Sequence, residues 1–452
     1  MGVDAQLVCQ RLYATAALTI VSAVPAPLGQ TIVMKFGGTS VADAERIKRA
    51  AGRIVRAHEQ GNRVVAVLSA RGKTTDELVA MAREVSERPD PREMDMLLST
   101  GERISCALAA MVINDLGHQA ISLTGSQAGI VTDTSHTKAR ILDVRADRIR
   151  DALDEDKVVL VAGFQGVSTS YDVTTLGRGG SDTTAVALAA ALGADVCEIY
   201  TDVSGVYSAD PRIVPEARKL RFVSFEEMLE MAASGAKVLQ LRSVEYARNH
   251  GVRIHCRSSF EDGPGTFVLT EEETMERPLV TAVTHSTDEA RVTLTGLPDR
   301  PGIAGRVMTA LAEANVNVDM IIQNEPQSEG KSADMSFTVP RDDIRGAHDA
   351  LEPLVEELGI GTIASDPAMG KVSLVGAGMR SHPGVAAKAF SVLGDAGVNI
   401  EMISTSPIKI SCVVREADVA CAVRELHTAF ELGADAVRRE DVQGVHRPVV
   451  SS

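Results

Sequence analysis

The feature that most constrains the fold is a regular alternation of short apolar segments with helical patterns between residues 31 and 258. Thr31–Phe36, Arg63–Ser69 and Val158–Phe164 have the length of strands, and the last carries no charged residue, as is typical of a strand buried on both faces. Such alternation predicts a three-layer α/β domain with a mostly parallel sheet. The other expected elements are the helices Ala42–Glu59, Asp76–Glu87, Glu93–Leu116, Val144–Glu155, Ser224–Ser234 and Ala236–Asn249 and the strands Gln119–Thr124, Val196–Asp202 and Arg253–Arg257.

A glycine-rich loop opens the Ala- and Leu-rich helix within Leu176–Leu188. Gly179 and Gly180 belong to a set of three glycines in four residues, which lets backbone N–H groups approach an anion closely. Ser181 and Asp182 occupy N-cap positions, so the helix N-terminus is a candidate anion site. Arg178 adds a planar group suited to a carboxylate or phosphate. Taken alone, the loop favours a functional site only slightly over an ordinary glycine turn that caps a helix.

Polar clusters follow four of the expected strands. They are Lys35–Thr39, Ser69–Thr75, Gly163–Gly166 and Thr201–Arg212. Because ligands of open α/β sheets bind beyond the carboxyl ends of the strands, we expect these clusters to converge. Their cationic and glycine-rich composition suits a polyanion, and Asp182, Asp202 and Asp210 are candidates for a hydrated Mg²⁺ or the hydroxyls of a nucleotide. This combination favours phosphoryl transfer, which depends on positioning and charge neutralisation.

Several other classes of protein are disfavoured. A Walker P-loop ending at Gly72-Lys73-Thr74 needs glycine at position 67, which is Val67, and the loop at Gly177 fails the dinucleotide fingerprint. A net charge of −15 and the absence of a basic cluster argue against a nucleic-acid-binding protein. The six cysteines are scattered, so neither a disulfide framework nor a zinc site is expected, and a metal held by side chains alone is disfavoured.

The N-terminal segment contains an uncharged stretch, Leu12–Met34, of the length of a membrane span. Pro25 and Pro27 interrupt it, and its charged flank is weak for a signal peptide. We therefore expect residues 1–30 to be a poorly ordered extension of a cytoplasmic enzyme, with export as the less favoured alternative.

Several ordered motifs give the chain a resemblance to the aspartate kinase family. They are Lys35-Phe-Gly-Gly-Thr-Ser, Thr100-Gly-Glu-Arg-Ile-Ser, Gly163-Phe-Gln-Gly, Thr175-Leu-Gly-Arg-Gly-Gly-Ser-Asp-Thr-Thr, Thr201-Asp-Val-Ser-Gly-Val-Tyr and Ala209-Asp-Pro-Arg. The resemblance implies an amino acid kinase fold over residues 31–268. It also implies phosphorylation of the aspartate β-carboxylate by ATP with Mg²⁺, the first step towards lysine, diaminopimelate, threonine and methionine.

The same resemblance implies roles for individual residues. Lys35 and Asp182 match the catalytic positions. The substrate pocket is expected to contain Ser69, Thr75, Glu102, Phe164, Arg178, Gly179, Gly180 and Ser181. Within it, Arg178 binds the α-carboxylate and Glu102 the ammonium group. The nucleotide is expected to contact Lys35, Gly37, Gly38, Thr201, Asp202, Tyr207, Asp210, Arg212 and Lys237. As alternatives, Asp210-Pro-Arg is a simple turn and Glu102 a surface helix residue.

The C-terminal third contains an internal repeat. Arg291-Val-Thr-Leu-Thr-Gly and Asn315–Ile321 correspond to Lys371-Val-Ser-Leu-Val-Gly and Gly397–Ile403, with an offset of 82 residues between Asn317 and Asn399. Each copy is predicted to be β-α-β-β and resembles an ACT module, which binds amino acids. We assign a linker to 269–289 and the modules to 290–368 and 369–446. A plain α+β dimerisation domain is the alternative.

The resemblance implies feedback by lysine, threonine or both, and a homo-oligomer. The effector contacts would be Asp299, Asn317, Asp319, Gln323, Val385, Asn399 and Ile400. The chain departs from the family pattern at Pro326, Ala386, Lys388 and Pro407. Because a lysine repels a cationic effector and proline lacks an N–H donor, our hypothesis is that concerted feedback is weakened or lost. A second hypothesis is a separately made regulatory subunit that begins near Met275.

Two rival functions remain at this stage. Related acetylglutamate, glutamate 5- or UMP kinases share the fold but do not normally carry the tandem repeat. A catalytically inactive amino-acid sensor is the other, although Lys35, Arg178, Asp182 and Lys237 are all present.

Overall fold

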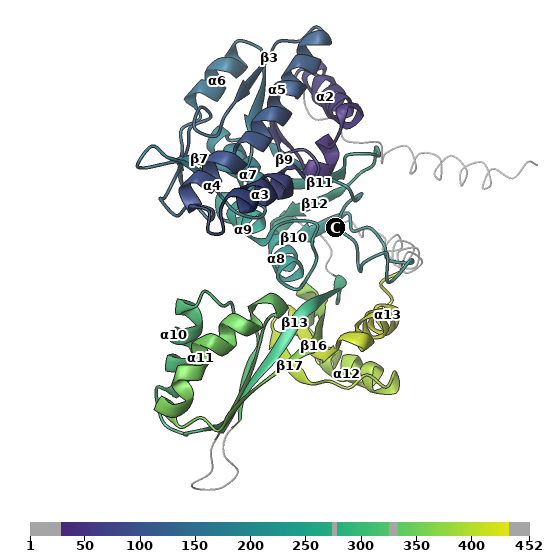
Figure 1. The fold of residues 1–452 in the computed structure, drawn as a ribbon. Coiled ribbons are helices and arrows are strands. Elements are labelled where there is room, and N and C mark those ends of the chain that lie inside the picture. Colours follow the sequence, from purple (N-terminus) through teal and green to yellow (C-terminus); the bar gives the residue numbers. More distant parts are fainter. Residues whose placement is uncertain (1–28, 274–277, 325–332, 434–452) are drawn as a thin grey trace, which may run out of the picture. The chain divides into compact units, whose positions relative to one another are not determined.

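The computed structural model describes residues 29–273, 278–324 and 333–433 (Figure 1). The chain divides into two compact units. The first contains the residues up to Gly205 together with Glu245–Phe267, and the second contains Val206–Val244 and the residues from Val268 onwards. The predicted N-terminal extension, except for Gly29 and Gln30, lies outside the described residues, as does Met275.

The first unit is built on a parallel sheet, which confirms the predicted fold class. The strands run in the order β11-β9-β1-β2-β6-β3, and each neighbouring pair is parallel. Their bounds are Thr31–Phe36 (β1), Arg63–Leu68 (β2), Ala120–Leu123 (β3), Val158–Ala162 (β6), Val196–Thr201 (β9) and Ile254–Ser258 (β11), with β12 (Thr266–Leu269) next to β11. All five residues of β6 are buried, as its continuous apolar sequence predicts.

Helices cover both faces of this sheet (Figure 1). On one face, α2 (Ala44–Glu59) packs against α5 (Thr100–Asp115), and both contribute to a core with β1, β2 and β6. On the other, α7 (Gly180–Leu192) contacts β1, β2 and β9, and α6 (Asp147–Asp154) contacts β6. The first ten residues of α7 are buried, so the predicted loop opens a central helix.

A small second sheet within the first unit was missed by the sequence analysis. Its order is β5-β4-β7-β8, with bounds Ile130–Thr132 (β4), Ile141–Val144 (β5), Gln165–Ser168 (β7) and Val173–Thr175 (β8). The predicted helix Val144–Glu155 was therefore wrong at its start, because Val144 pairs with Ile130 and the helix begins at Asp147. Strands of three or four residues are too short to give a periodic pattern.

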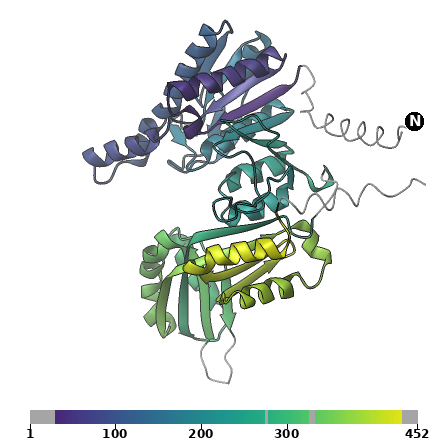
Figure 2. The same ribbon diagram turned by 90° about the vertical axis from the view of Figure 1, so that its right-hand side faces the viewer.

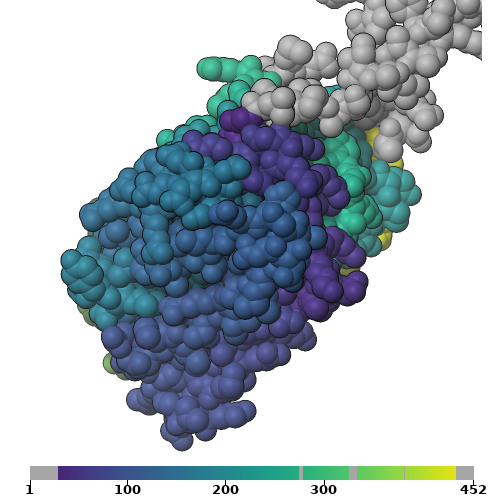
Figure 3. All heavy atoms as spheres, turned by 90° about the horizontal axis from the view of Figure 1, so that it is seen from above, coloured from purple at the N-terminus to yellow at the C-terminus, as the bar shows by residue number. Residues whose placement is uncertain are grey.

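The predicted helix Glu93–Leu116 is two helices, α4 (Pro91–Leu98) and α5, preceded by α3 (Thr74–Val85). They separate at Ser99, whose hydroxyl donates to Met96 O, while Thr100 Oγ1 donates to Leu97 O. Such side-chain bonds compete with helix continuation. Pro91–Asp115 is long and apolar enough to span a membrane by composition, but half of its most apolar window is buried in the protein. The tip of α3 projects from this unit (Figure 3), with Val85 87% exposed.

The second unit contains an antiparallel sheet in the order β14-β15-β13-β16-β18-β17. The strands are Ala282–Leu297 (β13), Ile321–Asn324 (β14), Ala333–Pro340 (β15), Thr362–Val375 (β16), Met402–Ser406 (β17) and Lys409–Arg415 (β18). The helices are Ile303–Glu313 (α10), Ile344–Leu358 (α11), Val385–Asp395 (α12) and Val419–Ala429 (α13), and Figure 2 shows α13 in yellow along the strands. The β-α-β-β order of both predicted modules is confirmed.

Strand β13 is shared by the two modules. Its first part pairs with Lys371–Val375 of β16 and contributes Val283 to the core under α12 and α13. Its second part pairs with β15 and contributes Val292 and Leu294 to the core under α10 and α11. The predicted linker 269–289 therefore needs correction, because residues 282–289 are the first half of a strand.

Residues 206–244 were expected to belong wholly to the catalytic domain, but they are part of the second unit. They carry β10 (Phe222–Ser224), α8 (Phe225–Ala233) and the start of α9 (Leu241–His250). Ala209 and Val214 lie in the core of the second module. Ser208 lies 3.0 Å from His427 Nε2, a pair that joins this segment to α13. Glu227 of α8 accepts hydrogen bonds from Thr281 Oγ1 and Ala377 N.

The remaining short elements are 3₁₀ helices. They are η1 (Gly38–Val41), η2 (Glu271–Glu273), η3 (Arg341–Asp343), η4 (Ala377–Ser381) and η5 (Glu416–Asp418). Of these, η1 follows β1 after one residue and begins within the first predicted cluster.

Gly235 tests how tightly residues 206–244 pack within the second unit. Its φ is +104°, and a Cβ there would lie 1.9 Å from the backbone oxygen of His285. Gly302, with φ +96° and open space, is a matched control. We expect Gly302→Ala to cost about 1 kcal/mol of unfolding free energy from backbone strain and Gly235→Ala about 2 kcal/mol more from the clash. Urea unfolding of both variants measures this, and equal losses would contradict the packing.

Candidate active site

The clusters after β1, β2 and β6 meet at the carboxyl ends of these strands, as predicted, whereas the cluster after β9 is divided between the two units. Lys35, near the end of β1, extends its ammonium to 2.6 Å from Oδ1 of Asp182 in the first turn of α7. Both side chains are nearly buried, at 12% and 9% exposed. The contact is an ion pair rather than an aligned hydrogen bond, because Asp182 Oδ1 has no hydrogen-bond partner among the described residues. A cation and an acidic group thus meet at a helix N-terminus, where the backbone favours anions.

Glycines allow the backbone to approach closely around this pair. A Cβ on Gly37 would lie 3.4 Å from Lys35 Nζ, and one on Gly38 only 2.8 Å from Ala70 O. A Cβ on Gly163 would lie 2.7 Å from Ser181 Oγ. The Gly37 distance is ordinary contact, but at Gly38 and Gly163 the ends of β1, β2 and β6 and the start of α7 are brought together with no room for a side chain. Such close approach is the reason for glycine at these positions.

Glu102 is a buried carboxyl that contacts Ala70 in the cluster after β2. It lies in the first turn of α5 with 3% exposure, so the alternative of a surface helix residue is wrong. Its Oε1 accepts from Ala70 N at 3.1 Å, whereas Oε2 is buried without a partner among the described residues. Burial raises the pKa of Glu102 to about 7. A cationic ligand group would relieve this cost, because it pairs with the ionised form.

Part of the predicted substrate set, Phe164 and Gly179–Ser181, lies at the start of α7. Phe164 has a φ of +67°, which is strained for a residue with a side chain, and its ring lies 2.9 Å from where a Cβ on Gly180 would be. Gly179 caps α7 with φ +74°. Arg178 is exposed on the preceding loop. Ser69 follows β2, and Thr75 lies in the first turn of α3, each half-buried.

The predicted nucleotide contacts divide between the two units. Thr201 and Asp202 follow β9 in the first unit, and the Thr201 hydroxyl lies 3.1 Å from Asp202 Oδ1. Tyr207, Asp210, Arg212 and Lys237 belong to the second unit.

In the second unit, Asp210 and Arg212 form the turn that was the alternative interpretation. Arg212 N donates to Asp210 Oδ1 at 2.9 Å, and its guanidinium holds the pKa of Asp210 below the ordinary value. Burial lowers the pKa of His285 on β13, Asp210 opposes that shift, and Arg212 and Lys237 add to it. Asp210, Arg212, Lys237 and His285 are therefore close enough to interact. Sequence reasoning missed His285, because nothing in the sequence links this position to residues 48 or more positions earlier.

Magnesium fits the site only together with a nucleotide. The described residues contain no group of three or more His, Cys, Asp or Glu side chains placed to hold a metal ion. Asp182 offers one carboxylate, whose Oδ1 is ion-paired with Lys35. Mg²⁺ is usually held by one or two carboxylates plus phosphate oxygens, and this donor set agrees with that arrangement.

Of the predicted effector residues, several are exposed and two are packed. Asp299, Asn317, Asp319, Gln323 and Asn399 are exposed, whereas Val385 lies in the core of the second module and Ile400 packs against it. Val385 and Ile400 can therefore offer an effector little beyond their backbone. Asn399 Nδ2 donates to Glu401 Oε1 at 3.1 Å.

Asp319, one of the predicted effector contacts, is already paired with a lysine of the chain. Lys371 on β16 is 4% exposed, and its ammonium lies 2.5 Å from Asp319 and 2.9 Å from Glu289. This pairing could not be predicted from the sequence, since Lys371 lies in an apolar strand pattern. Lys388, expected near the effector, has its ammonium 4.7 Å from the ring centre of Phe430. Pro326 lies outside the described residues.

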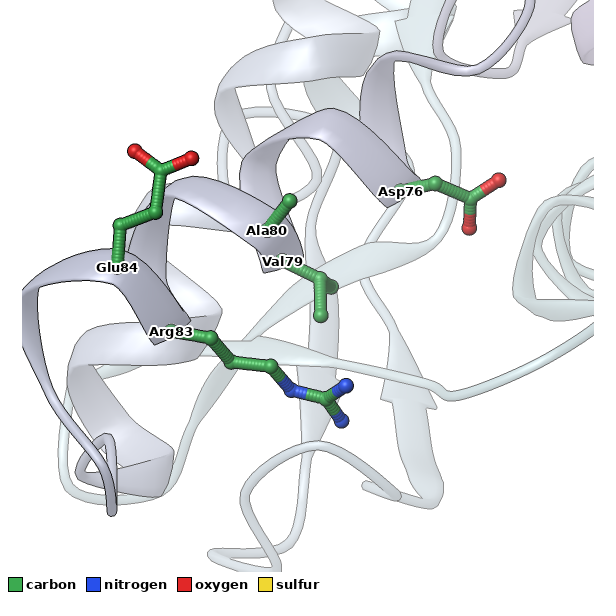
Figure 4. Close-up of a pocket in the computed structure, with 5 residues that line it drawn as sticks. All are labelled: Asp76, Val79, Ala80, Arg83 and Glu84. Atoms are coloured by element: carbon green, nitrogen blue, oxygen red, sulfur yellow. The ribbon is translucent and has the colours of Figure 1, made fainter.

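A hollow on the outer surface of α3 does not form part of this site. It is lined by Asp76, Val79, Ala80, Arg83 and Glu84, all from one helix (Figure 4). In Figure 4 the side chains of Arg83 and Glu84 point apart, so no set of polar groups converges there. A ligand site normally needs such convergence.

The comparisons with known proteins agree with this geometry. The model of the amino acid kinase family matches residues 30–258, and two ACT domain models match 291–358 and 372–430. The chain is 59% identical over 407 residues to the aspartokinase of Mycolicibacterium smegmatis, covering 89% of this chain and 97% of that protein. It is similar to E. coli aspartokinase III in complex with aspartate and ADP (R-state), with a TM-score of 0.74, 27% identity, and 88% and 99% of the two chains covered. The T-state complex of the same enzyme with lysine and aspartate gives a TM-score of 0.69 at 28% identity, with 88% and 99% covered.

A catalytic domain of the amino acid kinase type, followed by two ACT domains, is thus the class that the fold and the site define. Within that class, the chain belongs to the aspartokinase family.

The raised pKa of Glu102 leads to a prediction about stability. Because the pKa is about 7 in the folded protein and near 4.5 when unfolded, the stabilising effect of the neutral carboxyl is complete below pH 4.5 and is lost as the pH rises through 7. Glu102→Gln removes this loss. Between pH 5 and pH 8, the unfolding free energy of the variant relative to the parent should rise by roughly 2 to 3 kcal/mol.

Urea unfolding at several pH values measures the effect. Glu84→Gln is the control, since Glu84 is exposed on α3 and its change in formal charge is the same. A Glu102→Gln difference that stays constant with pH would contradict the burial of an ionisable group.

Proposed function

We propose that the site at the strand ends of the first unit catalyses the aspartokinase reaction, in which ATP phosphorylates the β-carboxylate of L-aspartate to give 4-phospho-L-aspartate. Membership of the aspartokinase family supports this function. The observation in the structure that carries it is Glu102 Oε2, a buried acidic oxygen without a partner among the described residues. The other oxygen of Glu102 accepts from Ala70 N, and Ala70 O lies against Gly38, three residues after Lys35. The reaction is the first step towards lysine, diaminopimelate, threonine and methionine.

In the proposed mode of binding, the substrate is held at both of its non-reacting charges. Glu102 pairs with the ammonium group, which restores the ionised form of its carboxyl and compensates for its burial. Arg178, exposed at the mouth of the loop, binds the α-carboxylate through its planar fork. Ser69, Thr75, Phe164, Gly179, Gly180 and Ser181 complete the pocket. This leaves the β-carboxylate directed towards Lys35 and Asp182.

The chain's own groups then supply positioning and charge. Aspartate's β-carboxylate is already ionised at neutral pH, so the attack needs no general base. Lys35 neutralises negative charge on the transferring phosphoryl group, and Asp182 holds the lysine ammonium in place. The N–H group of Gly38 is proposed as a further donor, whereas that of Gly37 donates to Tyr200 O at 3.4 Å. Thr201, Asp202, Tyr207, Asp210, Arg212 and Lys237 are proposed nucleotide contacts.

Magnesium is proposed to enter with ATP, with Asp182 as the acidic side chain nearest to it. When bound, the ion neutralises phosphate charge and orients the phosphates. Location of the enzyme in the cytoplasm and association into an oligomer stay predictions.

Lys35→Met tests the catalytic assignment. It removes the cation but keeps the length of the side chain, and we expect kcat to fall roughly 100- to 1000-fold. The assay follows ATP consumption with aspartate and traps the acyl phosphate with hydroxylamine. Lys48→Met, at an exposed position on α2, is the matched control. Because the variant leaves Asp182 nearly buried without its cation, Lys35→Met/Asp182→Asn serves as a second variant with no unpaired charge.

The same assay separates the rival functions. Acyl hydroxamate formed only with aspartate supports the proposal, whereas turnover with glutamate, acetylglutamate or UMP would favour a related kinase. No turnover with any of them would favour an inactive sensor. Parent-level activity of Lys35→Met would refute the role of Lys35.

We further propose that feedback inhibition by lysine and threonine together is weak in this protein. Asp319, a proposed effector contact, already pairs with the buried Lys371, so a cationic effector would have to compete with an ammonium of the chain. The departures at Ala386 and Pro407 also alter the proposed effector surface.

Measuring activity with lysine, threonine and both tests this proposal. The expected result is little inhibition by the pair beyond the effects of each alone. Lys371→Met should increase the response to lysine, because it frees the Asp319 carboxylate. Strong synergistic inhibition of the unaltered protein at low millimolar concentrations would contradict the hypothesis.

A further inference from the structure

Asp95 is a completely buried carboxyl that the proposed mechanism does not use. It lies on α4 with 0% exposure and accepts hydrogen bonds at both of its oxygens. Thr175 Oγ1 donates to Oδ1 at 2.5 Å, and His136 Nδ1 lies 2.7 Å from Oδ2. Thr137 N donates to both oxygens at 3.1 Å. A buried acidic group with this many donors is costly to disturb, because every lost donor leaves it less satisfied.

The donors come from two segments that Asp95 ties together. One is the loop between β4 and β5, which carries His136 and Thr137, and the other is the end of β8 at Thr175. Thr137 has a φ of +66°, a strained conformation for a β-branched residue, and the paired bonds to its N–H hold it there. Ala139 N also donates to Thr175 O at 2.9 Å, so the loop runs alongside β8.

These segments lead directly to the substrate loop. Thr175 is followed by Leu176, Gly177 and Arg178, and the next residue, Gly179, is the N-cap of α7. Gly177 packs on the carbonyl of Thr137, since a Cβ there would lie 3.2 Å from that oxygen. The position of Arg178 is therefore set on one side by α7 and on the other by the segment that Asp95 holds.

We propose that Asp95 and His136 are positioning residues for Arg178, and so determine how tightly the carboxylate of the amino-acid substrate is held. This inference rests on the proposed function, in which Arg178 binds the α-carboxylate. His136 acts through Asp95 and Thr137 and has no direct contact with substrate in this account. A displacement of about 1 Å in a substrate clamp is enough to change turnover by up to 100-fold.

A pair of substitutions at His136 separates positioning from mere stability. His136→Leu removes the donor at Nδ1, whereas His136→Asn places an amide N–H near the same point. We expect His136→Leu to raise the KM for aspartate about tenfold, to leave the KM for ATP within about twofold, and His136→Asn to restore most of the aspartate KM. Equal rises in both KM values, no rise, or no rescue by Asn would overturn the proposal.

Arg178→Ala provides the thermodynamic test of the connection. If His136 acts through Arg178, His136→Leu has no further effect on the aspartate KM in the Arg178→Ala background, whereas independent effects would multiply. Multiplying effects would overturn the inference but leave the proposed function intact. An Arg178→Ala variant with an unchanged aspartate KM would instead refute the role of Arg178 in the proposed function. Asp95→Asn should raise the aspartate KM further. If the Asp95→Asn variant does not fold, the His136 variants still test the proposal, because the His136 side chain is partly exposed and its replacement disturbs the core less.

Discussion

The parallel pairing of β1 with two neighbours is the constraint on which the site depends. Lys35 is in register with Val67 on β2 and with Ile199 on β9, so its backbone is fixed on both sides. The helix α7 packs across the same strands and brings Asp182 to the lysine ammonium. A slip by one residue in β1 would turn Lys35 to the other face of the sheet and separate the pair. The chemistry of the site is thus a consequence of strand register.

The sequence predicted the parts of the fold that come from long, strongly apolar or periodic segments. The bounds of β1, β2 and β9 agree with the expected strands to within a residue or so, because a strand buried on both faces has an unbroken apolar sequence. The short strands β4 and β5 were missed because three or four residues give no period. The break at Ser99 was also missed, since it depends on side-chain bonds to the backbone that a hydrophobic pattern does not record.

The sequence predicted which strand ends contribute to the candidate site, but not the burial and pairing of its side chains. Because parallel strands end at a common edge, the clusters after β1, β2, β6 and β9 could be expected to meet. The burial of Glu102 and the partner of Asp319 could not, because each depends on contacts between residues distant in sequence. The division of the proposed nucleotide contacts between two units has the same origin, since Asp210 follows β9 by few residues but lies beside the core of the second ACT domain.

Strand β13 is a single structural member common to both ACT domains, with Val283 in one core and Val292 in the other. The boundary between the two ACT domain matches therefore does not separate two independently packed domains. An ACT domain taken from a relative cannot be exchanged alone, because the graft divides a strand whose two halves serve different cores. The natural unit of exchange is the whole pair together with residues 206–220, whose Ala209 and Val214 complete the second core. For recombination between relatives, the interchangeable block is larger than a domain and discontinuous along the gene.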